Sequence, residues 1–255
     1  MRSLFILLLA VGFCRCNPAG ENDKKNADTI TNTLITEQNT KIEPVKGTAA
    51  DIPASVKLAG KLVEVWKWKD KMGDNLLITS VVAPYKDNKK NEYGEEGFSA
   101  EVHAVHYAGM NGAFQQVWSV SEKETSCPFD ITCEFIKDAI SITDLDADQV
   151  AETTIQYKTA CRSDVSPAAM KLVMHEGATA YSLRGLMWIN AGDGEKFTVT
   201  ENDANLEKLQ GYKGTEEEYM KTFGRYESEK EFAAAPKEFL SHARSRWIKF
   251  AVETF

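Results

Sequence analysis

The sequence predicts a mainly β fold: an antiparallel meander with β-propeller-like blades and a C-terminal amphipathic helix, α+β overall. Three observations predict it. Runs of alternating apolar and polar residues, the period of a half-buried strand, recur between Leu58 and Met187. Short turns rich in Gly, Asp and Asn separate these runs. Apolar residues at helical spacing appear only after Thr215.

The chain opens with an apolar run, Leu4 to Phe13, which is too short to span a bilayer and has the length of a signal-peptide core. The run stops at Cys14, so residues 1–16 are predicted to be a signal peptide with a lipobox, and Cys14 the lipidated residue. Cys16 is the second candidate. Ordinary cleavage near Ala10 to Gly12, releasing an unanchored exported protein, stays as the alternative.

Residues 17–50 are rich in Asn, Thr, Lys, Glu and Gly and show no apolar period, so they predict a disordered tether. Residues 51–255 are long enough for a single globular β-rich domain, with helices from about residue 215. The formal charge of −8 argues against nucleic acid, since phosphate binding needs a basic stripe. The sequence predicts contact with a membrane through the lipid anchor only.

Six segments have strand periodicity, and short polar turns join them into three hairpins. They are Leu58 to Lys69 with Asn75 to Ala83, Ser99 to Ala108 with Phe114 to Val120, and Met170 to Met174 with Ala178 to Met187.

An acidic cluster lies between the second and third hairpins. Carboxylates stand at every second position, in Asp144, Asp146 and Asp148, and Glu152 follows. Ca²⁺ takes six to eight oxygen ligands, including backbone carbonyls, and Val150 could supply one. The cluster therefore predicts a calcium-binding loop between two strands.

The loop is not an EF-hand. That motif needs Gly at its sixth position and Glu at its twelfth, where this chain has Gln149 and Ile155. Without the Gly, a residue with a side chain must adopt positive φ, at a cost of about 1 kcal/mol. The alternative is a metal-free turn, in which the Asp side chains accept hydrogen bonds from backbone N–H groups.

The C-terminal region changes to helical patterns. Thr215 to Glu218 reads as a capping box for a short helix ending near Phe223. Pro236 stands where a first helical residue is favoured. The residues that follow at helical spacing form an apolar stripe, expected to cover the sheet: Phe239, Leu240, Ala243, Trp247, Phe250 and Ala251.

Three cysteines remain in the predicted domain, and export favours a disulfide. We predict one bridge through Cys161. Folding the central segment about its turn brings Cys133 close to Cys161, and Cys127 is the competing partner. Three free thiols are the remaining alternative.

No catalytic signature is present. The sequence lacks Gly-x-Ser-x-Gly, His-Glu-x-x-His and a phosphate-binding Gly loop. His103 and His106 stand three apart in a predicted strand, so their side chains should point to opposite faces. Paired carboxylates of the glycosidase type leave no mark in a sequence, because their separation arises in the fold. Whether the protein is an enzyme is left open, with the balance against it.

Several segments resemble a family of exported bacterial proteins of surface polysaccharide biosynthesis, over roughly residues 60 to 250. They are Trp68-Lys69-Asp70, Cys127-Pro128-Phe129-Asp130, Ile142 to Asp146, Cys161 to Pro167, Leu183-Arg184-Gly185 and Phe239-Leu240. The resemblance implies association with the cell envelope and a link to surface glycans. It implies a bridge between Cys127 and Cys161, and it implies no catalytic residues.

Two functions follow as expectations. The first is a non-catalytic envelope module that binds a glycan or an envelope assembly protein. Its polar edge would combine the Asp144 loop with Arg162, Asp164 and Ser166, although an ordinary solvated loop would have the same composition. The second is a hydrolase that acts on envelope polysaccharide through acidic residues.

Overall fold

The computed structural model describes residues 41–91, 94–110, 113–189 and 196–253. These residues belong to one compact unit, residues 39–255. The expected signal peptide, its Cys14 lipidation site and residues 17–40 of the expected tether lie outside the described residues. Residues 41–50 of that tether are described, and Val45–Lys46 forms a strand paired in a sheet, so the folded unit begins before residue 51.

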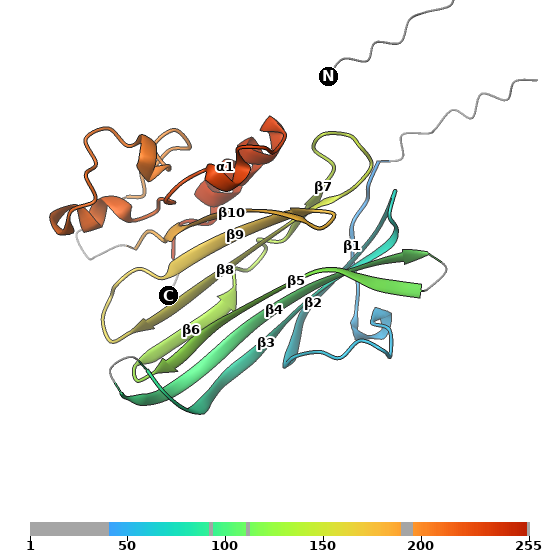
Figure 1. Ribbon diagram of the computed structural model, residues 1–255, viewed down its shortest axis with the longest axis horizontal. Helices are drawn as coiled ribbons and strands as arrows, with labels where there is room; N and C mark the ends of the chain where they lie inside the picture. The colour runs from blue at the N-terminus through green and yellow to red at the C-terminus, as the bar shows by residue number, and fades with distance from the viewer. Residues whose placement is uncertain (1–40, 92–93, 111–112, 190–195, 254–255) are drawn as a thin grey trace, which may run out of the picture. The chain divides into compact units, whose positions relative to one another are not determined.

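Five strands form the first sheet, called sheet A, in the order β1-β2-β3-β4-β5, with antiparallel neighbours (Figure 1). Each pair from β2 to β5 is consecutive in the chain, so the sheet is a meander, as predicted. The strands are β1 (Val45–Lys46), β2 (Lys61–Asp70), β3 (Gly73–Lys90), β4 (Glu96–Met110) and β5 (Ala113–Cys127).

The second sheet, called sheet B, has the order β10-β9-β8-β6, and β7 pairs with the other part of β8. All of its neighbours are antiparallel. Its strands are β6 (Asp130–Phe135), β7 (Ser141–Thr143), β8 (Glu152–Arg162), β9 (Ala169–Glu176) and β10 (Thr179–Leu186).

The alternating pattern explains the strands. In β4, Ala100, Val102 and Ala104 are buried on one face, while Glu101 and His103 alternate with them on the other. His106 is buried on the first face, so the two histidines point to opposite faces, as predicted.

Strand β3 runs past Pro84, beyond its predicted end. The register between β3 and β4 shifts between Val82 and Tyr85. Proline has no N–H to donate, and a bulge accommodates it because one ladder bond is missing there anyway.

The two sheets share a core. Leu77, Val102 and Trp118 from sheet A pack with Ile155 and Val173 from sheet B. In the described part of the chain, the strands thus form two sheets in contact, and the prediction of propeller-like blades is wrong. Alternation within a strand does not specify how finished sheets associate.

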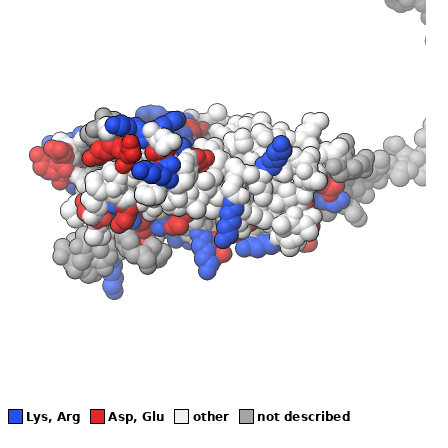
Figure 2. Space-filling model, turned by 90° about the horizontal axis from the view of Figure 1, so that it is seen from below, with Lys and Arg blue, Asp and Glu red and all other residues white. Residues whose placement is uncertain are grey.

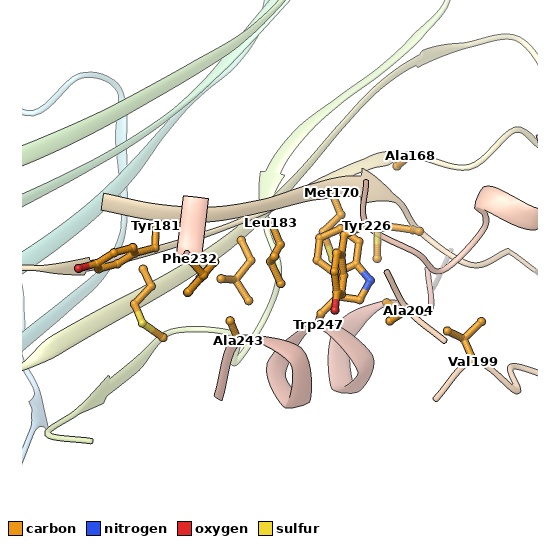
Figure 3. Close-up of a cluster of buried hydrophobic side chains, with 14 of the residues drawn as sticks. Ala168, Met170, Tyr181, Leu183, Val199, Ala204, Tyr226, Phe232, Ala243 and Trp247 are labelled. Atoms are coloured by element: carbon orange, nitrogen blue, oxygen red, sulfur yellow. The ribbon is translucent and has the colours of Figure 1, made fainter. Parts of the chain in front are cut away.

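The other face of sheet B is covered by α1 (Lys237–Phe250), as predicted (Figure 1). Figure 3 shows Trp247 and Ala243 of this helix pointing toward Met170 and Leu183 of the sheet. Trp247 is fully buried and donates from Nε1 to the Gly224 carbonyl at 2.9 Å. Burial of such side chains contributes about 1.5–3 kcal/mol each.

The other helices found among the described residues are short 3₁₀ helices. They are η1 (Ala49–Asp51), η2 (Leu206–Lys208), η3 (Glu216–Thr222) and η4 (Lys230–Phe232). The segment predicted from its capping box is η3, but the Thr215 side chain makes no capping bond there. Glu218 instead accepts from the Lys213 N–H at 2.7 Å, before the helix begins.

One disulfide joins Cys127 at the end of β5 to Cys161 on β8, so it links the two sheets. A bridge through Cys161 is therefore confirmed, and the resemblance identified the right partner. The expectation that folding about the turn brings Cys133 close to Cys161 is wrong. The register differs by two residues, because β6 pairs Cys133 with Thr159. Cys133 is a buried free thiol.

Within the described ranges, no helix has the length and apolar composition needed to cross a bilayer. On the face that Figure 2 shows, acidic and basic side chains lie close together at one end, and an area with few charges covers much of the rest. This face therefore carries no continuous stripe of one sign.

Candidate functional site

The acidic loop, residues 144–151, connects β7 to β8 at one end of sheet B. Strand pairing places its base beside a second acid: Glu152 lies opposite Glu176 of β9. Directly paired residues of antiparallel strands project from the same face. The loop and Glu176 therefore share one side of the sheet.

The carboxylates converge in two groups. One oxygen each of Asp144, Asp146 and Glu152 lie within 4.8 Å of one another, and the same is true of Asp146, Asp148 and Glu176. Asp146 belongs to both groups. The arrangement offers hard oxygen ligands of the kind that divalent cations prefer, so these clusters could hold a metal ion.

The three aspartates also accept hydrogen bonds from the loop backbone. Gln149 N–H donates to Asp144 at 3.3 Å, Asp148 N–H to Asp146 at 3.3 Å, and Val150 N–H to Asp148 at 2.7 Å. Each bond goes to Oδ1. The turn-capping geometry is thus present as well, and it leaves a second oxygen on each aspartate for another ligand.

Two loop residues with side chains have positive φ: Ala147 at 61° and Gln149 at 71°. The prediction that the missing Gly would force such a conformation is confirmed. Each costs on the order of 1 kcal/mol in a conformation that only Gly adopts freely.

Glu152 lies fully buried at the base of the loop. It accepts from the Thr143 hydroxyl at 2.8 Å and from the Leu145 N–H at 3.0 Å. Burial raises its pKa to about 7, although these two hydrogen bonds oppose the shift.

Glu176 has a buried Oε1 without a hydrogen-bond partner in the described part of the chain. Burial raises its pKa, and the negative charges of Asp146, Asp148 and Asp144 raise it further. In the described ranges, no Lys, Arg or His forms an ion pair with Glu176 or the other four carboxylates. The repulsion among these acids is therefore not offset by a neighbouring cation of the protein.

The loop is attached to sheet A through the turn between β2 and β3. Asp70 Oδ2 accepts from Ala151 N–H at 3.1 Å and from Trp68 Nε1 at 2.8 Å. Lys71 N–H donates to the Gln149 carbonyl at 2.8 Å. These bonds hold the loop from the opposite sheet.

A stack of four rings lies between the sheets near this attachment. Trp68 stacks on His106 at 5.0 Å, His106 contacts Trp118 at 5.8 Å, and Trp118 stacks on His175 at 4.0 Å between ring centroids. His106 Nε2 donates to Asn75 Oδ1 at 2.9 Å. Burial lowers the pKa of both histidines to about 4, so both are neutral at physiological pH.

The second set of predicted site residues lies elsewhere. Glu152 and Arg162 are the two ends of β8, so an 11-residue strand separates the acidic loop from Arg162, Asp164 and Ser166. The expectation that they form one polar edge is wrong, because an extended strand carries its ends about 30 Å apart.

Arg162 binds the C-terminal segment. Its Nη1 and Nη2 donate to the two oxygens of Glu253 at 3.0 and 2.6 Å, and Nη1 also donates to the Ser166 carbonyl. Asp164 accepts from the Ser166 N–H at 3.1 Å. The Glu253 side chain is 1% exposed, so this pair holds the segment around Glu253 against β8.

Sequence reasoning missed Glu176 and Asp70. The place of Glu176 opposite Glu152 follows from the β8–β9 register, which the acidic spacing does not indicate. The contact of Asp70 with Ala151 joins segments 81 residues apart, and no local pattern indicates it.

Comparison of the chain with protein-family models, with curated proteins and with solved structures finds no match.

Proposed function

We propose that the protein is an exported, lipid-anchored, non-catalytic binding module of the cell envelope, and that its acidic loop holds a calcium ion. The observation that carries the proposal is the convergence of Asp144, Asp146 and Glu152 with a second group that shares Asp146. Its partner is a glycan or an envelope assembly protein in surface polysaccharide biosynthesis.

Calcium suits the site better than a transition metal. The ligands are carboxylate oxygens, which favour hard cations, and the described residues of the two groups include no imidazole or thiolate. The loop is short and irregular, which suits the flexible coordination of Ca²⁺ better than the strict octahedron of Mg²⁺. A bound cation would also offset the repulsion that raises the pKa of Glu176.

Burial favours binding over hydrolysis. A glycosidase needs a carboxylic acid that reaches the glycosidic oxygen and a second carboxylate that faces the sugar. Glu152 has the raised pKa of a general acid, but its side chain is fully buried and occupied by Thr143 and Leu145. A substrate would have to displace the loop to touch it.

Two features support export and anchoring. A disulfide is typical of proteins in oxidising compartments. The apolar run that ends at Cys14 has the length of a signal-peptide core.

Calorimetric titration of the metal-free protein with Ca²⁺ tests the loop. We expect binding heat and a higher melting temperature, because a ligand that binds only the folded state stabilises it by about 2.7 kcal/mol at a hundredfold excess over Kd. Asp146→Ala should abolish both effects, since Asp146 belongs to both groups.

Asp164→Ala is the matched control. Asp164 also accepts one backbone N–H in a turn, but it lies at the far end of β8. If neither heat nor a melting shift appears at millimolar Ca²⁺, the loop is a metal-free turn and the calcium proposal fails.

The anchor has a separate test. Cells expressing the protein with Cys14→Ser should lose its acyl label and release it from the membrane fraction, and Cys16→Ser is the control. If a variant with both Cys14→Ser and Cys16→Ser fractionates like the unchanged protein, the lipoprotein proposal is overturned.

A further inference from the structure

A pocket of about 640 Å³ lies at the β1-β2-β3 side of sheet A. Its apolar walls come from Val45, Trp68, Leu76 and Phe114. Trp68 and Leu76 are buried residues of the sheet, whereas Val45 is 53% exposed and Phe114 is half-buried. The volume falls within the range of 300–1,000 Å³ that is typical of small-molecule sites.

The charged residues of the pocket balance each other. Lys67 pairs with Asp51 at 2.5 Å, and Lys69 pairs with Asp74 at 2.9 Å. The remaining two, Lys41 and Glu43, have opposite signs. Three cations and three carboxylates therefore face the pocket, and its net charge is zero.

This balance argues for a neutral ligand. An anion would approach lysines whose charge the neighbouring carboxylates already offset. A cation would approach carboxylates whose charge the neighbouring lysines already offset. A purely apolar chain would remove the ion pairs from water without replacing the lost hydrogen bonds, which is costly.

A saccharide can contact both the apolar and the charged residues of the pocket. Its ring offers C–H faces to apolar side chains such as Val45 and Phe114. A hydroxyl group can donate to a carboxylate while it accepts from an ammonium group, and each Lys–Asp pair presents both partners side by side.

We propose that this pocket binds a neutral saccharide unit of a glycan. The inference rests on the proposed role as a binding module, and it names the ligand class and the place where the ligand binds. The pocket is also joined to the acidic loop, because Trp68 in its wall donates to the same Asp70 oxygen as Ala151.

Titration of the calcium-loaded full chain with oligosaccharides, followed by calorimetry and tryptophan fluorescence, tests the ligand class. The probes are neutral cellohexaose and maltohexaose, anionic hyaluronan hexasaccharide, and decanoate as an apolar chain. We expect saturable binding of at least one neutral probe with a change in tryptophan emission. Binding of only the anionic or only the apolar probe, or of none, overturns the proposal.

Two variants test the location. Phe114→Ala removes an apolar wall, and Val45→Glu adds a charge at a position whose side chain is 53% exposed. Each should weaken binding of the neutral probe at least tenfold. Phe129→Ala is the control, since Phe129 is 53% exposed and lies just after β5, whose opposite end carries Phe114.

Equal affinity in all three variants would show that the glycan binds elsewhere and would overturn the pocket assignment. The calcium heat should be unchanged in Phe114→Ala and Val45→Glu. Loss of saccharide binding with intact calcium binding therefore tests the pocket, and loss of calcium binding in Asp146→Ala tests the loop.

Discussion

Asp70 at the end of β2 in one sheet and Ala151 in the acidic loop of the other are joined by a hydrogen bond of 3.1 Å. The same carboxylate accepts from Trp68 Nε1 and from Met72 N–H. Three donors from two sheets thus depend on one side chain. The acidic loop is therefore held in place by sheet A as well as by its own strands.

Asp70→Asn should destabilise the protein by about 1–3 kcal/mol, because an amide group would turn an N–H₂ toward one of these donors and leave it unsatisfied. It should also reduce the stabilisation by Ca²⁺, since Ala151 would lose its anchor. Urea unfolding with and without Ca²⁺ measures both. Asp74→Asn is the control, because its partner Lys69 is 83% exposed and such a pair contributes at most about 1 kcal/mol. Equal effects of the two substitutions would contradict the anchoring role.

Glu152→Gln should stabilise the calcium-free protein at pH 8 and have no such effect at pH 4.5. The pKa of Glu152 is raised to about 7 in the folded protein, so the folded state holds its proton more tightly than the unfolded state. Stability from this group is present below the unfolded pKa and is lost as the pH rises through 7. The shift corresponds to at most about 3 kcal/mol at 1.36 kcal/mol per pKa unit.

The measurement is urea unfolding in EDTA between pH 4.5 and 8. Glu218→Gln is the control with the opposite sign, because hydrogen bonds from Lys221 and Lys213 lower the pKa of Glu218. Parallel curves for Glu152→Gln and the wild type would show that Glu152 is not protonated near neutral pH.

His175→Phe should make stability less sensitive to acid. The pKa of His175 is lowered to about 4 by burial and by the proximity of His106. The stability that neutral His175 contributes is therefore present above its unfolded pKa near 6.5 and is lost as the pH falls through 4. The loss is at most about 3 kcal/mol. Phe keeps the stacking on Trp118 without a titrating group. His106 and the nearby Asp70 carboxylate remain, so the acid sensitivity should decrease rather than vanish.

Unfolding curves at pH 7 and pH 4.5 measure this effect. His103→Phe, on the outer face of β4 beside Glu101, serves as the control. A similar acid sensitivity in His175→Phe and wild-type protein would mean that the histidine is not buried in its neutral form.

Peptide mapping without reductant should find Cys127 bonded to Cys161. Removing both with alanine should cost about 3–4 kcal/mol, since the bridge closes a loop with a sequence separation of 34. Cys133→Ala should cost much less. Burial raises the pKa of Cys133 to about 11, so its thiol should react slowly with iodoacetamide until the protein unfolds. Rapid alkylation of Cys133 in the native protein would contradict its buried position.

The sequence by itself determined the elements whose evidence is local. Alternation between Leu58 and Met187 predicted the three hairpins, and the stripe that contains Phe239 and Trp247 predicted α1. The acid spacing located the loop, and the missing Gly predicted the positive φ of Gln149. Such features depend on a few neighbouring residues, so their pattern is visible without the fold.

The tertiary structure decided what depends on strand register and on contact between sheets. It paired Cys133 with Thr159 rather than Cys161, and it brought Glu176 opposite Glu152. A shift of two residues keeps every side chain on the same face, so hydrophobic alternation cannot distinguish these registers. The bond from Ala151 to Asp70, and the pocket built around Trp68, arise where separate segments meet. Only the tertiary fold creates them, because no local pattern records which distant segments will lie against each other.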